Sequence, residues 1–499
     1  MDYGQVIASL FERHRSVQTA GFSPDAYKPG IGQMLDYAAF LGNPERRFRS
    51  IHVAGTNGKG SVCTMLAAAL AASGSRTGLY TSPHLIDFRE RIKVIERPGD
   101  CGSQNFASLI PPTALRLWAP PVHAATGGHG SETLSVPGPS DWCRMIPKEE
   151  VVEFLEKYDR DGLSFFEVTT GMAFWWFARQ GVDYAVIETG LGGRLDSTNV
   201  ITPEISVITS IGLDHCALLG GTRAEIAAEK AGIFKPGVPA LVWGRDPETQ
   251  PVFERIAAEK GSPLHYAEDY AVPQGLAPDL DGPCQEMNLR TVWAALSILG
   301  ISGTEEGIRC AARMTGFRGR WEVLSRKPLV ICDIAHNPPA LAENFSRLRR
   351  LSGLSGGVGG NAPRPLGVQG DSSLTASAVG GNAPRPLGVQ GDRECLHSRP
   401  LLVVYGAMAD KDVAGIAALM PQEAEYYLVA PAGERAMPVK DLALKLKNLN
   451  FTESGSVAAG VEAALSRADA LARDGLDPIV YIGGSTFVVA EAVSYLGSV

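Results

Sequence analysis

Short apolar runs alternate with longer amphipathic segments along most of the chain. Runs rich in Val, Ile and Leu, bounded by polar residues or glycine, predict buried strands at 51–54, 77–80, 184–187, 205–209 and 239–243. Apolar residues at helical spacing predict helices at 6–11, 34–41, 62–70, 148–158 and 172–179. Apolar strands that alternate with helices are typical of a parallel sheet covered on both faces. The pattern therefore predicts an α/β fold around such a sheet.

Two stretches interrupt this alternation, a first insertion at 98–145 and a second insertion at 352–398. Both are crowded with proline, glycine and serine, and in the second the segment 358–371 recurs identically at 379–392. Such a composition cannot bury enough apolar surface to offset the entropy of ordering, and two copies without a packable element do not form a repeat array. We therefore expect two flexible surface insertions, which cost little closure entropy. A partner-binding role for the second is the less favoured alternative.

The composition narrows the class of protein. A chain of 499 residues is too long for one core and predicts two or three domains, and 45% hydrophobic with 20% charged residues is usual for a globular protein. The net charge of −8 argues against binding to nucleic acid or a membrane surface. Eight cysteines without a CxxC pair fit reduced thiols better than disulfides or a zinc site. With neither a secretion signal nor an apolar run that could span a bilayer, we expect a cytoplasmic protein.

A glycine-rich segment carries the first chemical signal. Residues 55–61 read Gly-Thr-Asn-Gly-Lys-Gly-Ser and lie between the predicted strand 51–54 and the predicted helix 62–70. In this arrangement backbone N–H groups and the helix N-terminus bind phosphate. Lys59 would reach the β- and γ-phosphates and Ser61 a magnesium ion, although Gly60 separates the two residues, unlike the usual P-loop. The segment predicts a nucleotide site; the alternative is an ordinary glycine-rich turn.

Polar residues follow two other predicted strands at the edge where chemistry occurs in parallel sheets. Glu188 ends one strand, and a carboxylate that faces a polyphosphate needs a divalent cation between them, so Glu188 is a candidate Mg²⁺ ligand. A helix cap or salt bridge is the structural alternative. His215 follows the next strand and would complete a metal shell or bind a phosphate oxygen, unless it is a loop histidine with an internal partner. Lys230, on a predicted helix, reads from the pattern alone as a solvated charge.

Several motifs, in order along the chain, resemble those of folylpolyglutamate synthases. They are GTNGKGS, TSPHL with FRERI, ETGLGGRLDSTN, SIGLDH, EKAGIFK, GRWE and DIAHNP. Bacterial members of this family are often bifunctional with dihydrofolate synthase, and the family belongs to the ATP-dependent Mur-type amide ligases. The resemblance covers nearly the whole chain outside the two insertions.

The resemblance implies two domains and a set of site residues. An ATP-binding domain with a P-loop parallel sheet would span 1–314, and a smaller Rossmann-like α/β domain 315–499. Nucleotide-binding residues would be Thr56, Asn57, Gly58, Lys59, Gly60, Ser61, Asn288, Arg320, Asp333 and His336. Two magnesium ions would be bound by Ser61, Ser82, Glu188 and His215. The catalytic residues would be Lys59, Glu188, His215 and Lys230, the last matching a lysine that the family carbamylates.

Further residues would serve the other substrates. Arg89 and Arg91 are expected on the pterin side, and Asp410 and Lys411 would bind the incoming glutamate or close the cleft. Three positions depart from the family pattern. They are Arg318 in place of a proline in the hinge motif, Cys284 in place of a histidine, and Ile334 in place of a glycine. The hinge is therefore expected to be less stiff.

The implied reaction uses ATP, L-glutamate and either dihydropteroate or a reduced folate. Phosphoryl transfer to a carboxylate gives an acyl phosphate, which the amino group of glutamate attacks, and we expect a monomer. One alternative is a Mur-type ligase for another carboxylate such as a peptidoglycan precursor, but too few residues precede position 55 for its additional domain. A P-loop nucleotide switch and an inactive homologue are the others; the first would not need Arg320, Asp333 and His336, and the intact phosphate and metal positions argue against the second.

Overall fold

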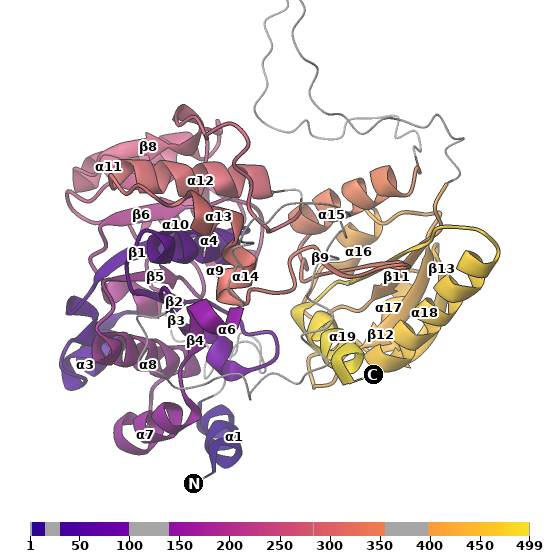
Figure 1. Cartoon of the computed structure of the whole chain (residues 1–499), viewed down its shortest axis with the longest axis horizontal. Coiled ribbons are helices and arrows are strands. Elements are labelled where there is room, and N and C mark those ends of the chain that lie inside the picture. The colour runs from indigo at the N-terminus through magenta and orange to yellow at the C-terminus, as the bar shows by residue number, and fades with distance from the viewer. Residues whose placement is uncertain (1, 15–29, 99–138, 283, 355–397, 499) are drawn as a thin grey trace, which may run out of the picture.

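The computed structural model describes residues 2–14, 30–98, 139–282, 284–354 and 398–498, which form two α/β domains side by side (Figure 1). The first domain is built on an eight-stranded sheet in the order β4-β3-β2-β5-β1-β6-β7-β8. Its strands are β1 (Arg49–Ala54), β2 (Thr77–Tyr80), β3 (Ile92–Ile95), β4 (Cys143–Met145), β5 (Tyr184–Glu188), β6 (Ile205–Ile208), β7 (Ala240–Val242) and β8 (Leu264–Tyr266). All neighbours are parallel except the pairs β2–β3 and β3–β4 at one edge.

Helices cover both faces of this sheet because alternate strand residues point to opposite sides. Ile51 and Val53 of β1 pack towards the face covered by α4 (Lys59–Ala72), α12 (Gln285–Ile298), α13 (Glu305–Arg309) and α14 (Ala311–Thr315). The opposite face is covered by α3 (Gly32–Phe40), α7 (Lys148–Tyr158), α8 (Phe165–Gln180), α10 (Arg223–Ala231) and α11 (Gln250–Lys260). Helix α4 is almost wholly buried, which explains its small apolar residues.

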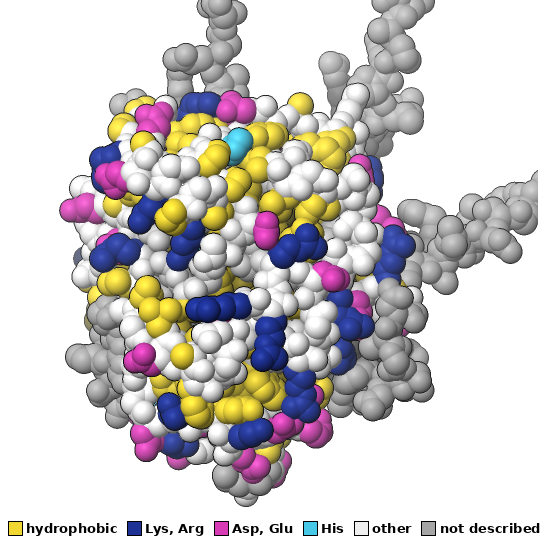
Figure 2. Space-filling view, turned by 90° about the vertical axis from the view of Figure 1, so that its left-hand side faces the viewer, with side chains coloured by type: hydrophobic (Ala, Val, Ile, Leu, Met, Phe, Trp, Pro, Cys, Tyr) yellow, Lys and Arg dark blue, Asp and Glu magenta, His cyan; other side chains and the backbone are white. Residues whose placement is uncertain are grey.

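Shorter or peripheral elements complete the first domain. They are α1 (Tyr3–Arg13), which packs on α7, α6 (Pro139–Trp142), α9 (Cys216–Leu219), and the 3₁₀ turns Pro44–Arg46, Phe88–Arg91, Ser197–Val200 and Ala267–Asp269. On the face shown in Figure 2, Lys and Arg side chains lie scattered with Asp and Glu side chains among them. Among the described residues, no helix is both long enough and apolar enough to cross a membrane.

The second domain has a six-stranded sheet in the order β13-β12-β11-β14-β10-β9. Its strands are β9 (Glu322–Arg326), β10 (Leu329–Asp333), β11 (Leu401–Tyr405), β12 (Glu425–Ala430), β13 (Asn450–Ser456) and β14 (Ile479–Gly483), parallel except for β9. One face packs on α15 (Pro338–Leu351), α16 (Val413–Ala417) and α17 (Val439–Lys445), the other on α18 (Val457–Arg473) and α19 (Thr486–Ser498). The chain enters this domain between Thr315, the last residue of α14, and Glu322.

The linker between the domains is held by its own side chains. Arg318, which stands where the family motif has proline, donates hydrogen bonds of 2.7 and 2.9 Å to the Glu322 carboxylate. The Gly319 N–H donates to the other oxygen of Glu322 at 2.8 Å, and the Ile334 N–H donates to the Gly319 carbonyl at 3.0 Å. This ion pair and these hydrogen bonds brace the linker in place of a proline ring.

The α/β prediction and the predicted strands are confirmed, with differences at element boundaries. Helix α8 begins at Phe165, several residues before the predicted start, because the Ser164 hydroxyl and the Glu167 side chain form a reciprocal capping box there.

The predicted insertions lie mostly outside the described residues, including both copies of the repeated segment. The predicted end of the first, at residue 145, is wrong. Residues 139–145 form α6 and the edge strand β4, and Trp142 packs into the core of the first domain. The predicted start of the second is wrong by three residues, because Ser352 is buried as the C-cap of α15 and Leu354 packs on the second domain's core.

Candidate active site

A cavity of about 310 Å³ lies between the two domains. We call its first-domain lining the floor; it contains Gly55, Thr56, Asn57, Gly58, Lys59, Gly60, Ser82, Arg91, Glu188, Asp196, Asp214, His215 and Lys230. We call its second-domain lining the wall; it contains Arg320, His336, Asn337, Asp410, Lys411, Arg435 and Ser485. The floor follows β1, β5 and β6, three adjacent strands whose carboxyl ends meet at one edge of the sheet.

The phosphate loop, residues 55–61, joins β1 to α4 as predicted, and close packing requires glycine at positions 55 and 58. A Cβ at Gly55 would lie 1.8 Å from Thr209 Oγ1, and one at Gly58 would lie 2.4 Å from Asn288 Oδ1. Gly58 is the N-cap of α4 with φ of 90°, a conformation that favours glycine. The Lys59 ammonium donates to the carbonyls of Gly55 at 3.1 Å and Thr56 at 3.3 Å, so it lies across the loop.

Helix α12 supports this loop from behind. Gln285 Nε2 donates to Ser61 Oγ at 3.3 Å, and Asn288 Nδ2 donates to Gln285 Oε1 at 3.1 Å. Ser61 is buried beneath the loop and Asn288 behind it, and neither lines the cavity. Cys284, which replaces the family histidine, is the N-cap of α12, and burial raises the pKa of its thiol to about 11.

Glu188 presents a buried carboxylate to the cavity at the end of β5. Its side chain lies beside Gly60, and its Oε2 accepts a hydrogen bond of 3.1 Å from the Ser82 N–H. Burial raises the pKa of Glu188, while the nearby Lys59 charge and the Ser82 hydrogen bond act to lower it. Oxygen ligands from one or two carboxylates and hydroxyls, completed by substrate phosphates, are the set that Mg²⁺ prefers in nucleotide sites. The residues present therefore fit a magnesium ion.

Lys230 is a buried amine, not the solvated charge that the local pattern indicated. It projects from α10 with its Nζ donating to the Gly55 carbonyl at 2.8 Å. Burial, together with the Lys59 charge, lowers the pKa of Lys230 to about 7. A neutral amine is thus available on the floor at neutral pH.

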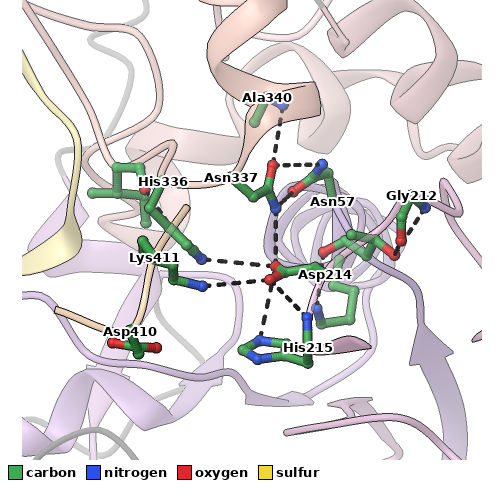
Figure 3. A network of polar contacts seen from close by, with 12 residues as sticks. Asn57, Gly212, Asp214, His215, His336, Asn337, Ala340, Asp410 and Lys411 are labelled. Atoms are coloured by element: carbon green, nitrogen blue, oxygen red, sulfur yellow. Dashed lines mark hydrogen bonds and ion pairs between the residues drawn. The ribbon is translucent and has the colours of Figure 1, made fainter. Parts of the chain in front are cut away.

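A network of polar contacts gathers around Asp214, in the loop after β6 (Figure 3). Asp214 Oδ1 accepts from the His215 N–H at 3.0 Å and lies 3.4 Å from Lys411 Nζ; Oδ2 accepts from Asn337 Nδ2 at 3.0 Å. His215 Nε2 and His336 Nε2 lie 3.8 and 3.9 Å from Oδ2. Burial acts to raise the pKa of Asp214, but these four neighbouring groups outweigh it and hold the pKa well below its usual range.

The two histidines of this network are neutral at pH 7, so Lys411 is its charged partner. Burial lowers the pKa of each histidine to about 4, despite the attraction of Asp214. His215 also adopts the left-handed conformation, with φ of 53°, at the start of α9. That backbone turns its side chain into the cavity beside Asp214.

The structure brings some of the predicted site residues to the cavity and leaves others away from it. Arg91 lines the floor and donates through Nε to His84 Nδ1 at 2.8 Å, while Arg89 is buried against Asp87, 2.7 Å away, outside the lining. Asp333 also lies outside the lining. Its oxygens accept hydrogen bonds of 2.7 to 2.8 Å from Trp321 N, Ala335 N and Asn344 Nδ2, so they hold the protein's own backbone and side chains.

Several residues of the cavity were not predicted, among them Asp214, Asn337 and Arg435. Asp214 and Asn337 adjoin the predicted residues His215 and His336, so their place in the motifs SIGLDH and DIAHNP was an available signal. Arg435 follows β12 and donates through Nη2 to Asp410 Oδ1 at 2.8 Å. No local pattern marks it, because only the folded sheet brings the loop after β12 beside the loop after β11.

Comparisons with known proteins agree with this geometry. The signature of the Mur ligase middle domain matches residues 167–271. A folylpolyglutamate synthase from Lacticaseibacillus casei is 30% identical over 466 residues, covering 88% of each chain. A dihydrofolate synthase/folylpolyglutamate synthase from Bacillus subtilis is 34% identical over 341 residues, covering 62% of this chain and 70% of the relative. The structure of Escherichia coli FolC in complex with DHPP and ADP superposes with a TM-score of 0.69 at 25% identity, covering 100% of this chain and 98% of FolC.

Proposed function

The chain belongs to the folylpolyglutamate synthase family of ATP-dependent ligases, and on that premise we propose that it joins L-glutamate to the carboxylate of a folate. We propose dihydropteroate as a second acceptor, which would make the enzyme bifunctional like the relative from Bacillus subtilis. Both relatives act on folates by name, which favours this substrate class over a peptidoglycan precursor.

One observation carries the proposal. The cavity places a phosphate loop with Lys59 and a buried carboxylate, Glu188, on its floor, opposite a wall that carries Arg320 and Lys411 from a separate domain. A simple nucleotide switch needs the floor alone. A ligase needs both sides, because it must hold a polyphosphate, a carboxylate and an amine together and exclude water.

The reaction follows from the chemistry of carboxylates. A carboxylate does not react with an amine at neutral pH because its leaving group is poor, so the γ-phosphoryl group of ATP is first transferred to it. The amino group of glutamate then attacks the carbonyl carbon, the C–N bond forms and phosphate leaves. Phosphoryl transfer depends on positioning and charge stabilisation, and Lys59 and Arg320 supply positive charge from opposite sides of the cavity.

Ser82, Glu188 and His215 line the cavity and would bind magnesium, whereas the predicted ligand Ser61 is buried, accepts a hydrogen bond from Gln285 and does not line it. When bound, the metal neutralises phosphate charge and orients the transferring group. The neutral state of His215 leaves a ring nitrogen free of a proton, as a metal ligand requires.

For Lys230 we propose carbamylation. The neutral amine attacks carbon dioxide, an N–C bond forms and one proton is released, leaving a carboxylate beside the phosphate loop. The lowered pKa of about 7 supports this step, because an ordinary lysine is almost fully protonated at that pH.

The test is phosphate release from ATP with magnesium and L-glutamate, compared with dihydropteroate, with tetrahydrofolate and with no pterin. Release with both pterins would support the bifunctional enzyme, and release with tetrahydrofolate alone a dedicated polyglutamate synthase. An ATP turnover that neither pterin increases would refute the folate proposal and leave the nucleotide site.

A further inference from the structure

Three residues of the wall meet on a single carboxylate of the floor. Asp214 lies within 3.0 Å of Asn337 Nδ2, 3.4 Å of Lys411 Nζ and 3.9 Å of His336 Nε2 (Figure 3). Asp214 and Lys411 are both partly buried, and each has 14% of its side chain exposed. An ion pair this protected is screened far less than one on the surface.

Asn337 links the same carboxylate to the phosphate loop. Its Nδ2 donates to Asn57 Oδ1 as well as to Asp214 Oδ2, both at 3.0 Å, and its Oδ1 accepts from Asn57 Nδ2 at 3.3 Å. The same Oδ1 accepts from Ala340 N at 3.1 Å, which makes Asn337 the N-cap of α15. One buried side chain of the second domain therefore contacts two floor loops and anchors its own helix.

We propose that Asp214 is a positioning residue, which holds Asn337 and Lys411 of the second domain over the phosphate loop. It acts through them: Lys411 lines the cavity beside His336, and the place of its ammonium relative to Lys59 is set by this carboxylate. The kinetic effects expected of this role rest on the proposed function. The contacts that define the role do not depend on it.

The arrangement offers a paired test at Asp214 and Asn337. Asn337→Asp retains a good N-cap for α15 but places a second carboxylate against Asp214. Asp214→Asn removes the charge that attracts Lys411. The double variant Asp214→Asn with Asn337→Asp exchanges the two groups, so that one amide again donates to one carboxylate. If these residues had no positioning role at the domain interface, exchanging them would not restore what the single substitutions lose.

Arg347→Gln is the control for a cross-domain ion pair away from the cavity. Arg347 Nη2 contacts Asp281 Oδ1 at 2.8 Å, neither residue lines the cavity, and 60% of the Asp281 side chain is exposed. Its removal should leave the steady-state constants within about threefold of the parent.

Two readouts are needed, steady-state kinetics with varied L-glutamate and small-angle X-ray scattering of the full chain with and without ADP. We expect Asn337→Asp to increase the radius of gyration and to lower kcat/KM by about 100-fold, and Asp214→Asn to lower it by about tenfold. The exchange should recover at least about tenfold over Asn337→Asp and restore the smaller radius. Thermal unfolding of each variant identifies any that fails to fold. If the Asn337→Asp variants fail to fold, the kcat/KM and radius of gyration of Asp214→Asn, compared with those of Arg347→Gln, decide the question.

A double variant that is as poor as the product of the two single variants would overturn the proposal. So would an unchanged kcat/KM and radius in Asp214→Asn. If the parent chain shows no folate-dependent turnover, the proposed function fails, but the scattering comparison still decides whether Asp214 holds the domains together.

Discussion

The floor and the wall of the cavity are built in different ways. Floor groups such as Glu188 and Lys230 are almost completely buried; Glu188 ends β5 at the centre of the first sheet, and Lys230 projects from α10, which packs on that sheet. Wall groups such as His336 and Lys411, with 36% and 14% of their side chains exposed, lie on loops and contact the floor only across the gap. The floor is therefore fixed by the core of one domain, whereas the wall takes its place only when the two domains meet. Substitutions should separate these two cases.

The largest effect is expected at Glu188 on the floor. Glu188→Gln keeps the shape of the side chain and removes the charge, so kcat for ATP turnover should fall by about 100- to 1,000-fold. Steady-state kinetics measure this. Glu229→Gln, at an acidic residue of α10 outside the cavity, is the matched control. A Glu188→Gln enzyme within tenfold of the parent would show that the carboxylate is only structural.

Gly55 tests how rigid the floor is. An alanine Cβ would lie 1.8 Å from Thr209 Oγ1, and the backbone has φ of 153°. We expect Gly55→Ala to lower the free energy of unfolding by about 3 kcal/mol, measured in urea. Gly32→Ala, in α3 where the added atom meets no neighbour within 4 Å, should be neutral or slightly stabilising. Equal stability of the two variants would mean that the loop backbone shifts to accommodate the added methyl group at little cost.

Burying the Lys230 amine should lower the free energy of unfolding, so this floor residue is expected to reduce stability in return for its function. In the folded chain its pKa is about 7, against about 10.4 in an unfolded chain, so the unfolded state binds the extra proton between these values. The cost to stability is therefore complete below pH 7 and disappears as the pH rises towards 10.

Lys230→Met removes this cost. In carbonate-free buffer it should raise the free energy of unfolding by about 2 kcal/mol at pH 7, less near pH 10, while abolishing ligase activity. Urea unfolding at several pH values checks the sign. A variant destabilised at pH 7 would contradict the buried-amine interpretation.

The smallest effect on stability is expected on the wall. Arg435→Gln breaks the contact with Asp410, whose side chain is 39% exposed, so the free energy of unfolding should change by less than about 1 kcal/mol. Because Arg435 lines the cavity, kcat/KM for L-glutamate should still fall by about tenfold. A loss of stability as large as that of Gly55→Ala would erase the distinction between floor and wall.

The sequence predicted the floor well because local signals specify it. The apolar strands, the glycine loop at 55–61 and the polar residues that end β5 and β6 are each visible in short windows, and parallel pairing brings them to one edge. Motif resemblance then added Lys230, which periodicity alone would have left on the surface.

The wall was less predictable because it depends on contacts between distant segments. Asp333 looked like a ligand-binding carboxylate, but its oxygens hold Trp321, Ala335 and Asn344. Arg435 gave no signal because the loop around it has no motif. The short strand β4 was missed within a stretch rich in proline, glycine and serine, since its pairing with β3, and not its composition, makes it a strand.

The described residues on either side of two chain segments lie close together, which has a practical consequence for protein engineering. The described residues that flank 99–138 meet where the Glu96 N–H donates to the Trp142 carbonyl at 3.0 Å, next to the paired strands β3 and β4. The described residues that flank 355–397 meet at a 2.9 Å hydrogen bond from Arg399 N to the Ser352 carbonyl. Since the described residues that flank each segment are hydrogen-bonded to each other, either segment could be replaced by a short linker or by a reporter domain whose termini lie close together. The molecule thus has two sites where a foreign sequence can be inserted without changing the fold of either domain.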